Sequence, residues 1–293
     1  MNEQRLIVVA GATGRQGGSV VRNLLRAGGW RIRGLTRDPD APKARELADR
    51  GVDVMRADMN DPKTLVPALQ GAYGLFSVQN FWEVGYDAEV LQGKNLADAA
   101  EAARVKHLVY SSVGGADRNT GLAHFDSKWE IEQHIRLLGL RHTVFRPVFF
   151  MDNFFGADFR EAIVGGTLPM ALPPKTTLQM LALEDIGAFV ALAFAHPDQF
   201  EHRALEIAGD ELTMPETADH FSRVLGYPVQ HQEVPMEQVR QRSPEWAKML
   251  EWFIAYGYKA DIPALRTLHP DLMSFDQWLS ATGWEQMATR KAA

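Results

Sequence analysis

A glycine-rich string directly after the first apolar run is the feature that most constrains the fold. The run LIVVA predicts a strand, and the string GATGRQGG at residues 11–18 separates it from a stretch with apolar residues at helical spacing. In this position Gly11 permits a tight turn, Gly14 lets the backbone approach a diphosphate, and Gly17 allows close helix packing. The first amides of the helix would face the anion. The string therefore predicts a dinucleotide-binding βαβ unit, the alternative being a purely structural turn.

The first 150 residues repeat this alternation of apolar run, turn and amphipathic stretch. Strands are expected at residues 6–10, 31–36, 52–56, 74–78, 107–111 and 142–146, and helices at 19–27, 41–50, 64–69, 87–103 and 125–138. Strands that alternate with helices indicate a parallel sheet. The prediction is an α/β fold with a Rossmann-type doubly wound sheet.

After Pro147 the regular alternation ends, and Pro and Gly become frequent. A smaller mixed α/β domain is expected over residues 151–293, following a nucleotide-binding domain over residues 1–150. Its strands are expected at 177–181, 205–208 and 229–234, and its helices at 186–194, 215–225 and 245–256, with the segment 275–279 closing the chain. The domain boundary near residue 150 is not sharply defined, because the strand near Thr177 could return to the first sheet.

Composition excludes several classes of protein. The chain has no cysteine, which rules out disulfides, thiolate metal sites and cysteine nucleophiles, and its histidines show no metal-binding spacing. A net charge of −6 without a basic stripe disfavours direct nucleic-acid binding. No apolar segment is long enough to span a membrane, and the N-terminus has no signal-peptide pattern. A cytoplasmic protein is expected, with no membrane partner and no metal.

The end of the second expected strand predicts which dinucleotide binds. There Thr36-Arg37-Asp38-Pro39 places Arg37 at the first position beyond the strand, and a guanidinium suits the 2′-phosphate of NADP(H). Arg15 in the glycine-rich turn is a second candidate for the same phosphate. If Asp38 faced the ribose instead, NAD(H) would be preferred, but Pro39 suggests that Asp38 begins the next turn. NADP(H) is the expected cofactor.

These motifs, together with three others, carry a family resemblance. Asn80-Phe81-Trp82-Glu83, the string HFDSK ending at Lys128, and the closing FDQWL at 275–279 resemble the NmrA-like atypical short-chain dehydrogenases/reductases over nearly the whole chain. Within that family the resemblance is greatest to the group typified by the human NADPH-sensing NmrA-like protein. It implies a Rossmann domain with a smaller C-terminal domain, in agreement with the periodicity.

The resemblance also implies cofactor contacts beyond the glycine-rich string. Asp58 and Met59 are expected around the adenine, Lys128 near the nicotinamide ribose, and residues 150–153 near the nicotinamide. Ordinary packing is the alternative for Phe81 and Trp82, and a solvated helix charge for Lys128. The full set of expected cofactor-binding residues is Gly11, Thr13, Gly14, Arg15, Gln16, Gly17, Thr36, Arg37, Asp58, Met59, Gln79, Asn80, Phe81, Lys128, Phe150 and Asn153.

The catalytic set implied by the resemblance is incomplete. Active short-chain dehydrogenases place a Tyr four residues before the Lys and a Ser near the end of the fifth strand. Here Lys128 and Ser112 are present, but His124 occupies the Tyr position. Either His124 substitutes as the acid, or it only ends a mobile loop at 114–124. Tyr110 is not expected to replace the missing group, because its ring lies on the opposite pleat from Ser111.

Two functional hypotheses follow. In the first, the protein binds NADP(H) and reports its redox state or amount to a protein partner, with 114–124 and 165–176 as mobile segments. In the second, it is an NADPH-dependent reductase of a small quinone, enone or carbonyl compound, whose flat pocket is lined by Phe149, Phe150, Phe154 and Phe155. Interdomain core is the alternative for these aromatics. The chain is expected to be a monomer or a weak homodimer. Trp246, Trp252 and Tyr256 are candidates for a dimer interface, the alternative being that they belong to a buried helix.

Overall fold

The computed structural model describes residues 4–289, which divide into two compact units. Unit 1 comprises residues up to Arg146 together with Leu183–Leu205, and unit 2 comprises Pro147–Ala182 with the chain from Glu206 onward. The chain therefore leaves the first unit, returns to it and leaves again. A single boundary near residue 150 does not capture this path.

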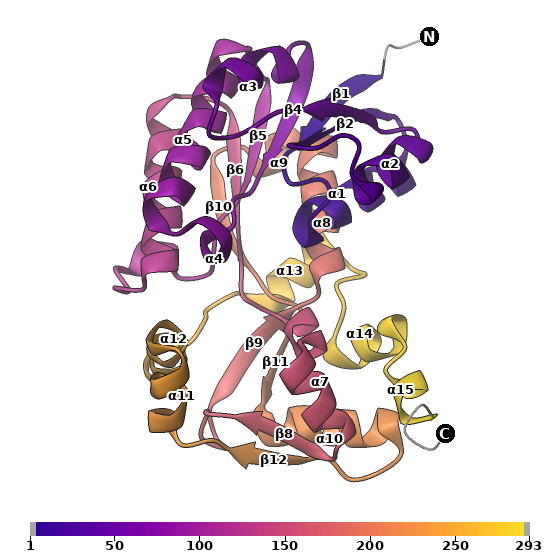
Figure 1. Cartoon of the computed structure of the whole chain (residues 1–293), viewed down its shortest axis with the longest axis vertical. Coiled ribbons are helices and arrows are strands. Elements are labelled where there is room, and N and C mark those ends of the chain that lie inside the picture. The colour runs from indigo at the N-terminus through magenta and orange to yellow at the C-terminus, as the bar shows by residue number, and fades with distance from the viewer. Residues whose placement is uncertain (1–3, 290–293) are drawn as a thin grey trace. The chain divides into compact units, whose positions relative to one another are not determined.

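Unit 1 is built on a seven-stranded sheet in the order β10-β6-β5-β4-β1-β2-β3 (Figure 1). Its β1–β2, β1–β4, β2–β3, β4–β5 and β5–β6 pairs are all parallel. The strands are β1 (Arg5–Val9), β2 (Trp30–Thr36), β3 (Asp53–Arg56), β4 (Ala72–Ser77), β5 (His107–Ser111), β6 (His142–Pro147) and β10 (Arg203–Ile207). The predicted doubly wound sheet is confirmed, and the strand order reverses between β1 and β4.

Helices cover both faces of this sheet (Figure 1). One face carries α3 (Pro62–Leu69), α5 (Tyr86–Ala102) and α6 (Ala123–Leu137), whose apolar residues share a buried cluster with the strands. The other carries α1 (Arg15–Ala27), α2 (Pro42–Asp49) and α8 (Leu183–Ala195). Short helices α4 (Phe81–Val84), η1 (Ala116–Arg118) and α9 (Pro197–Phe200) complete the unit. Both layers bury apolar side chains, as the near-continuous apolar strands require.

Helix α8 is the segment that brings the chain back to unit 1. Strand β9 (Thr177–Leu181) does not return to the first sheet, an option that the sequence left open. It pairs with β7 and β11 of unit 2. It is α8 that packs along α1, where a Cβ at Gly187 would lie 2.4 Å from the Ser19 carbonyl oxygen. Glu184 at the start of α8 accepts hydrogen bonds from Arg22 and Arg26. This helix–helix contact is long in range, so strand periodicity gave no sign of it.

Unit 2 contains two small sheets and the C-terminal helices. Sheet β11-β9-β7 joins β7 (Phe149–Phe150), β9 and β11 (Asp210–Thr213), and β12 (Gln230–Glu233) pairs with β8 (Thr167–Met170). The helices are η2 (Met151–Phe155), α7 (Ala157–Val164), α10 (Met214–Leu225), α11 (Met236–Arg242), α12 (Pro244–Ala255), α13 (Ile262–Leu268), α14 (Phe275–Thr282) and α15 (Glu285–Thr289).

Of the aromatic residues proposed to line a substrate pocket, Phe149 and Phe154 are buried in the core of unit 2, and Phe150 and Phe155 are half-buried. Phe154 is fully buried and contacts Phe221 and Phe275 at ring separations of 5.5 and 5.8 Å. Phe155 stacks on Trp284 at 5.2 Å. This packing favours the core alternative for Phe149, Phe154 and Phe155, because these rings already contact one another or the C-terminal helices. Of the residues suggested for a dimer contact, Trp252 is buried and Tyr256 is exposed.

Candidate functional site

The glycine-rich turn lies where the strand order of unit 1 reverses. It follows β1, and a Cβ at Gly11 would lie 3.3 Å from a methyl group of Val78, directly after β4. Gly11 has φ +62°, a conformation that L side chains rarely adopt. Open parallel sheets bind their ligands outside the carboxyl ends of the strands at such a switch point. The turn thus stands at the position where this fold accepts a nucleotide.

The turn has no space for a side chain at Gly17 and little space for one at Gly14. A Cβ at Gly17 would lie 2.2 Å from the Gly11 carbonyl oxygen, and one at Gly14 would lie 3.2 Å from the same atom. The Gly14 amide donates to the Gly11 carbonyl at 2.8 Å, which closes the turn. The backbone is therefore folded tightly against the start of α1. This geometry fits a diphosphate, because bare backbone amides can approach the anion.

The first turn of α1 is electrostatically suited to an anion. It contains no acidic residue, and Arg15 at its start is exposed. Gln16 is held in place by Ser111, whose hydroxyl donates to the Gln16 side-chain oxygen at 2.6 Å. The positive end of the helix dipole is thus uncompensated by side chains of the first turn. Thr13 is half-buried within the same turn.

Arg37 is exposed directly after β2 and carries an unpredicted partner. Its Nη2 donates to Glu83 of α4 at 3.1 Å. Asp38, the alternative ribose contact, uses a carboxylate oxygen to accept from the amide of Asp40 at 3.0 Å, while its own amide donates to the Thr36 hydroxyl. Asp38 therefore begins a turn, as Pro39 suggested. Glu83 belongs to the motif at residues 80–83, but the sequence did not indicate which cation its carboxylate would contact.

The ends of β3 and β4 are linked by the side chain of Gln79. Its amide nitrogen donates to the Ser77 hydroxyl at 3.1 Å and contacts the Met59 sulfur at 3.5 Å. The Gln79 oxygen is buried without a hydrogen-bond partner among the described residues. An unsatisfied buried acceptor is uncommon, and it suits a ligand hydroxyl. Asp58 caps its own turn by accepting from the Asn60 amide at 2.9 Å.

Lys128 is held in a buried ion pair and is not a solvated helix charge. Its ammonium donates to Glu89 Oε1 at 2.9 Å and to the Gln79 carbonyl at 3.3 Å, and its side chain is 12% exposed. Glu89 is completely buried and also accepts from the Ser127 hydroxyl at 2.5 Å. An ammonium has three donors, so one remains for a ligand. Sequence analysis missed Glu89, although a carboxylate beside the apolar residues of α5 was a signal.

His124 is buried in the first turn of α6 among aromatic rings, and it does not simply end a loop. The ring lies 5.6 Å from Phe81, 5.0 Å from Trp82 and 4.8 Å from Phe125. Trp82 itself is 60% exposed. The packing that was the alternative for Phe81 and Trp82 is thus present, at the point where α4 meets α6. In the segment that precedes α6, Asp117 accepts a hydrogen bond from the buried Arg146.

Ser112 forms no hydrogen bond to the other two expected catalytic residues, Lys128 and His124. The Ser112 hydroxyl is buried without a partner in the described part of the chain, so it binds neither Lys128 nor His124. Tyr110 lies on the α5–α6 side of β5 with its ring 6.0 Å from the Lys128 ammonium. Burial and the nearby Glu89 carboxylate raise the pKa of Tyr110 well above its ordinary value. Its hydroxyl is therefore a poor proton donor.

Two expected cofactor residues lie in unit 2. Phe150 ends β7, and Asn153 lies in η2, both half-buried. Their role therefore stays a prediction, and the site described here consists of residues of unit 1.

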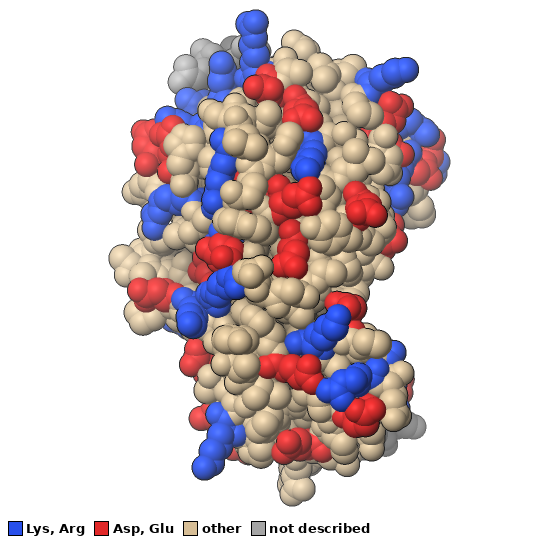
Figure 2. Space-filling model, turned by 90° about the vertical axis from the view of Figure 1, so that its left-hand side faces the viewer, with Lys and Arg blue, Asp and Glu red and all other residues tan. Residues whose placement is uncertain are grey.

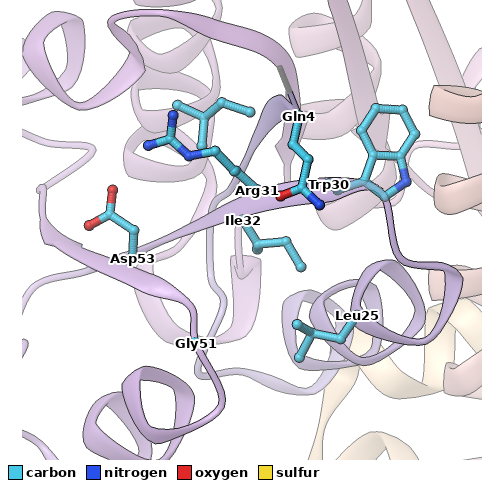
Figure 3. Close-up of a pocket in the computed structure, with 8 residues that line it drawn as sticks. Gln4, Leu25, Trp30, Arg31, Ile32, Gly51 and Asp53 are labelled. Atoms are coloured by element: carbon cyan, nitrogen blue, oxygen red, sulfur yellow. The ribbon is translucent and has the colours of Figure 1, made fainter. Parts of the chain in front are cut away.

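A separate small hollow lies at the amino ends of the strands of unit 1 (Figure 3). It has a volume of about 160 Å³ and is lined by Gln4, Leu6, Leu25, Trp30, Arg31, Ile32, Gly51 and Asp53. This is the edge of the sheet opposite the glycine-rich turn, so the hollow is not part of the candidate site.

Three global features bear on the class of ligand. Within residues 4–289, no group of three or more His, Cys, Asp or Glu side chains is arranged to hold a metal. In the same range, no helix combines the length and apolar character needed to cross a membrane. Figure 2 shows Lys and Arg side chains interspersed with Asp and Glu over the face that it draws.

Comparison with known proteins gives one family and several close folds. The model of the NmrA-like family matches residues 3–275. An NmrA-like family domain-containing protein of Dictyostelium discoideum is 28% identical over 95% of this chain and 98% of its own length. An NmrA-like family domain-containing oxidoreductase of Aspergillus versicolor is 33% identical over 74% of this chain and 68% of its own. The NADPH complex of an NADPH-dependent quinone oxidoreductase from Escherichia coli is 26% identical, with a TM-score of 0.80 over 94% of this chain and 99% of that one.

Proposed function

The chain belongs to the NmrA-like family, and from this premise we propose that it binds NADP(H) in unit 1 and acts as a sensor or regulator that responds to this cofactor. Membership confirms the resemblance carried by the sequence motifs. The cofactor assignment is supported by the tight glycine turn, the exposed Arg37 beyond β2 and the unsatisfied Gln79 oxygen. The NADPH complex of the related quinone oxidoreductase agrees with it.

The residues of this chain suggest how the cofactor is held. The turn at Gly11–Gly17 and the first amides of α1 bind the diphosphate, and Arg37 binds the 2′-phosphate through its planar guanidinium. Gln79 accepts from a ribose hydroxyl, and the third donor of Lys128 is available for another. When bound, NADPH supplies a hydride. A carbonyl reduction also needs a proton, which a side chain of the protein would have to donate.

The observation that favours a sensor is the state of Lys128. In a short-chain reductase the lysine assists an acidic hydroxyl, but here its ammonium is committed to the buried Glu89 and the Gln79 carbonyl. The position four residues earlier is His124, enclosed by Phe81, Trp82 and Phe125. The nearby tyrosine, Tyr110, is buried with a raised pKa. A cofactor site without a suitable proton donor fits a protein whose cofactor-bound state is recognised by a partner protein.

A reductase of a quinone-like compound is the second candidate, because the E. coli relative has that activity in its name and the Aspergillus relative is named an oxidoreductase. A quinone spreads the developing negative charge, so it depends less on a dedicated acid. Lys128 would then stabilise that charge electrostatically.

One experiment separates the two candidates. The purified chain is titrated with NADPH, NADP⁺ and NADH, and NADPH oxidation is then followed with a panel of quinones, enones and aldehydes. We expect tight NADP(H) binding without multiple turnovers. Arg37→Glu should weaken NADP(H) by about tenfold or more while sparing NAD(H). Sustained turnover with one of the compounds would replace the sensor by the reductase, and equal weakening of both cofactors would remove Arg37 as the 2′-phosphate contact.

A further inference from the structure

The partner of Arg37 is an acidic side chain from a different element. Arg37 follows β2, and Glu83 lies in α4, 46 residues further along the chain. The guanidinium donates to Glu83 Oε1 at 3.1 Å, and both side chains are more than half exposed. The second carboxylate oxygen of Glu83 accepts from Asn80 at 3.5 Å. A negative charge therefore already lies on the cation that the proposed function assigns to the 2′-phosphate.

This contact is not required by the core. Helix α4 has four residues, none of which is buried. Its backbone hydrogen bonds run from the amides of Glu83 and Val84 to the Asn80 carbonyl, and from Gly85 to Phe81. Gly85, with φ +79°, ends the helix at once. The Glu83 carboxylate thus lies on Arg37 without any packing that depends on it, and its removal should leave the fold intact.

We propose that Glu83 sets the cofactor specificity of the site by competing with the 2′-phosphate of NADP(H) for Arg37. The inference rests on the proposed function, in which Arg37 contacts that phosphate. A phosphate monoester carries a charge of about −1.5 to −2 at neutral pH. It must displace the carboxylate from the guanidinium fork and tolerate its negative charge nearby. NAD(H) has no 2′-phosphate, so its binding leaves the Arg37–Glu83 pair in place.

Arg37 therefore raises the affinity for NADP(H) and Glu83 lowers it. The preference for NADP(H) over NAD(H) is set by the difference between these two effects. Exposed ion pairs of this kind contribute about 0.2 to 1 kcal/mol, which corresponds to a change in affinity of up to about fivefold. Removal of the repulsion between carboxylate and phosphate adds to this. Neutralising Glu83 should tighten NADP(H) binding by about threefold to tenfold.

The test compares Glu83→Gln with the wild-type chain and with Arg37→Gln, alone and combined, by titration with NADPH and NADH. Asp40→Asn is the matched control, because Asp40 lies three residues from Arg37 and forms an exposed ion pair with Arg45 at 3.6 Å. We expect Glu83→Gln to tighten NADPH by about threefold to tenfold and to change NADH by less than about twofold. In the Arg37→Gln background this gain should shrink, because only the repulsion between the carboxylate and the phosphate then remains to be removed. Asp40→Asn should change neither cofactor by more than about twofold.

Three results would overturn the inference, and they are distinguishable. If Arg37→Gln weakens NADPH while Glu83→Gln leaves it unchanged or weakens it, Arg37 contacts the phosphate but Glu83 does not compete. If Arg37→Gln has no effect on NADPH, the proposed function loses its phosphate contact and the inference falls with it. A gain that Asp40→Asn reproduces would assign the effect to the general charge of the surface, against a specific role of Glu83.

Discussion

The buried ion pair between Lys128 and Glu89 leads to the sharpest prediction, which concerns stability. The Glu89 side chain is completely buried, and that of Lys128 is 12% exposed. In Lys128→Met the carboxylate would keep only the hydrogen bond from the Ser127 hydroxyl. A buried charge that loses its partner costs about 3 to 5 kcal/mol, a large part of the total stability of a domain. The same loss is not expected when both charges are removed together.

The assay is the unfolding of Lys128→Met, Glu89→Gln/Lys128→Met and the wild-type chain by urea and by calorimetry at neutral pH. Lys94→Met is the matched control. Lys94 joins the same two helices through Glu130 at 2.6 Å, but the two side chains are 34% and 43% exposed. Its loss should therefore cost at most about 1 kcal/mol. The double variant should recover about half or more of the stability that Lys128→Met loses.

The reasoning is refuted if Lys128→Met and Lys94→Met destabilise the protein equally, or if the double variant is no more stable than the single one. The outcome also bears on function. A loss of activity in a Lys128 variant identifies a catalytic role only if the protein is still folded. The double variant removes the ammonium without leaving a buried unpaired carboxylate, so it is the better variant for the turnover experiment.

Three further predictions concern single positions. Gly17→Ala should weaken NADPH binding by about tenfold or more in a titration, since its Cβ would lie 2.2 Å from the Gly11 oxygen, and unchanged binding would contradict the tight turn. Burial lowers the pKa of His107 to about 4, so the free energy of unfolding should fall as the pH drops from about 6.5 towards 4, by about 3 kcal/mol in total. His107→Gln should flatten that dependence in urea titrations; an unaltered slope would assign it to other groups. Thr213→Ala removes the hydroxyl that accepts from the Glu216 amide at the start of α10, and should cost about 1 kcal/mol in thermal unfolding. No change in melting temperature would mean that this cap is not needed.

The sequence alone predicted the first six strands of unit 1 and the helices between them, but it assigned α8 and β10 to the smaller domain, whereas both belong to unit 1. Its strands are short apolar runs bounded by turns, and the glycine string after β1 predicted a parallel sheet with a nucleotide turn. The sequence also placed Arg37 directly beyond β2 and identified His124 at the position of the expected tyrosine. These features depend on local spacing, because a strand or a turn is specified by the residues within it.

Only the tertiary structure decided which charges and rings meet. Lys128 and Glu89 lie on different helices, as do Arg22 and Glu184, while Arg37 and Glu83 come from a strand end and from α4. Contacts of this kind depend on the packing of segments distant in sequence, and an ionisable residue has the same local pattern whether it is solvated or buried in a pair. The aromatic residues after β6 show the same limit, because Phe154 and Phe155 gave no local sign that Phe221 and Trp284 would enclose them.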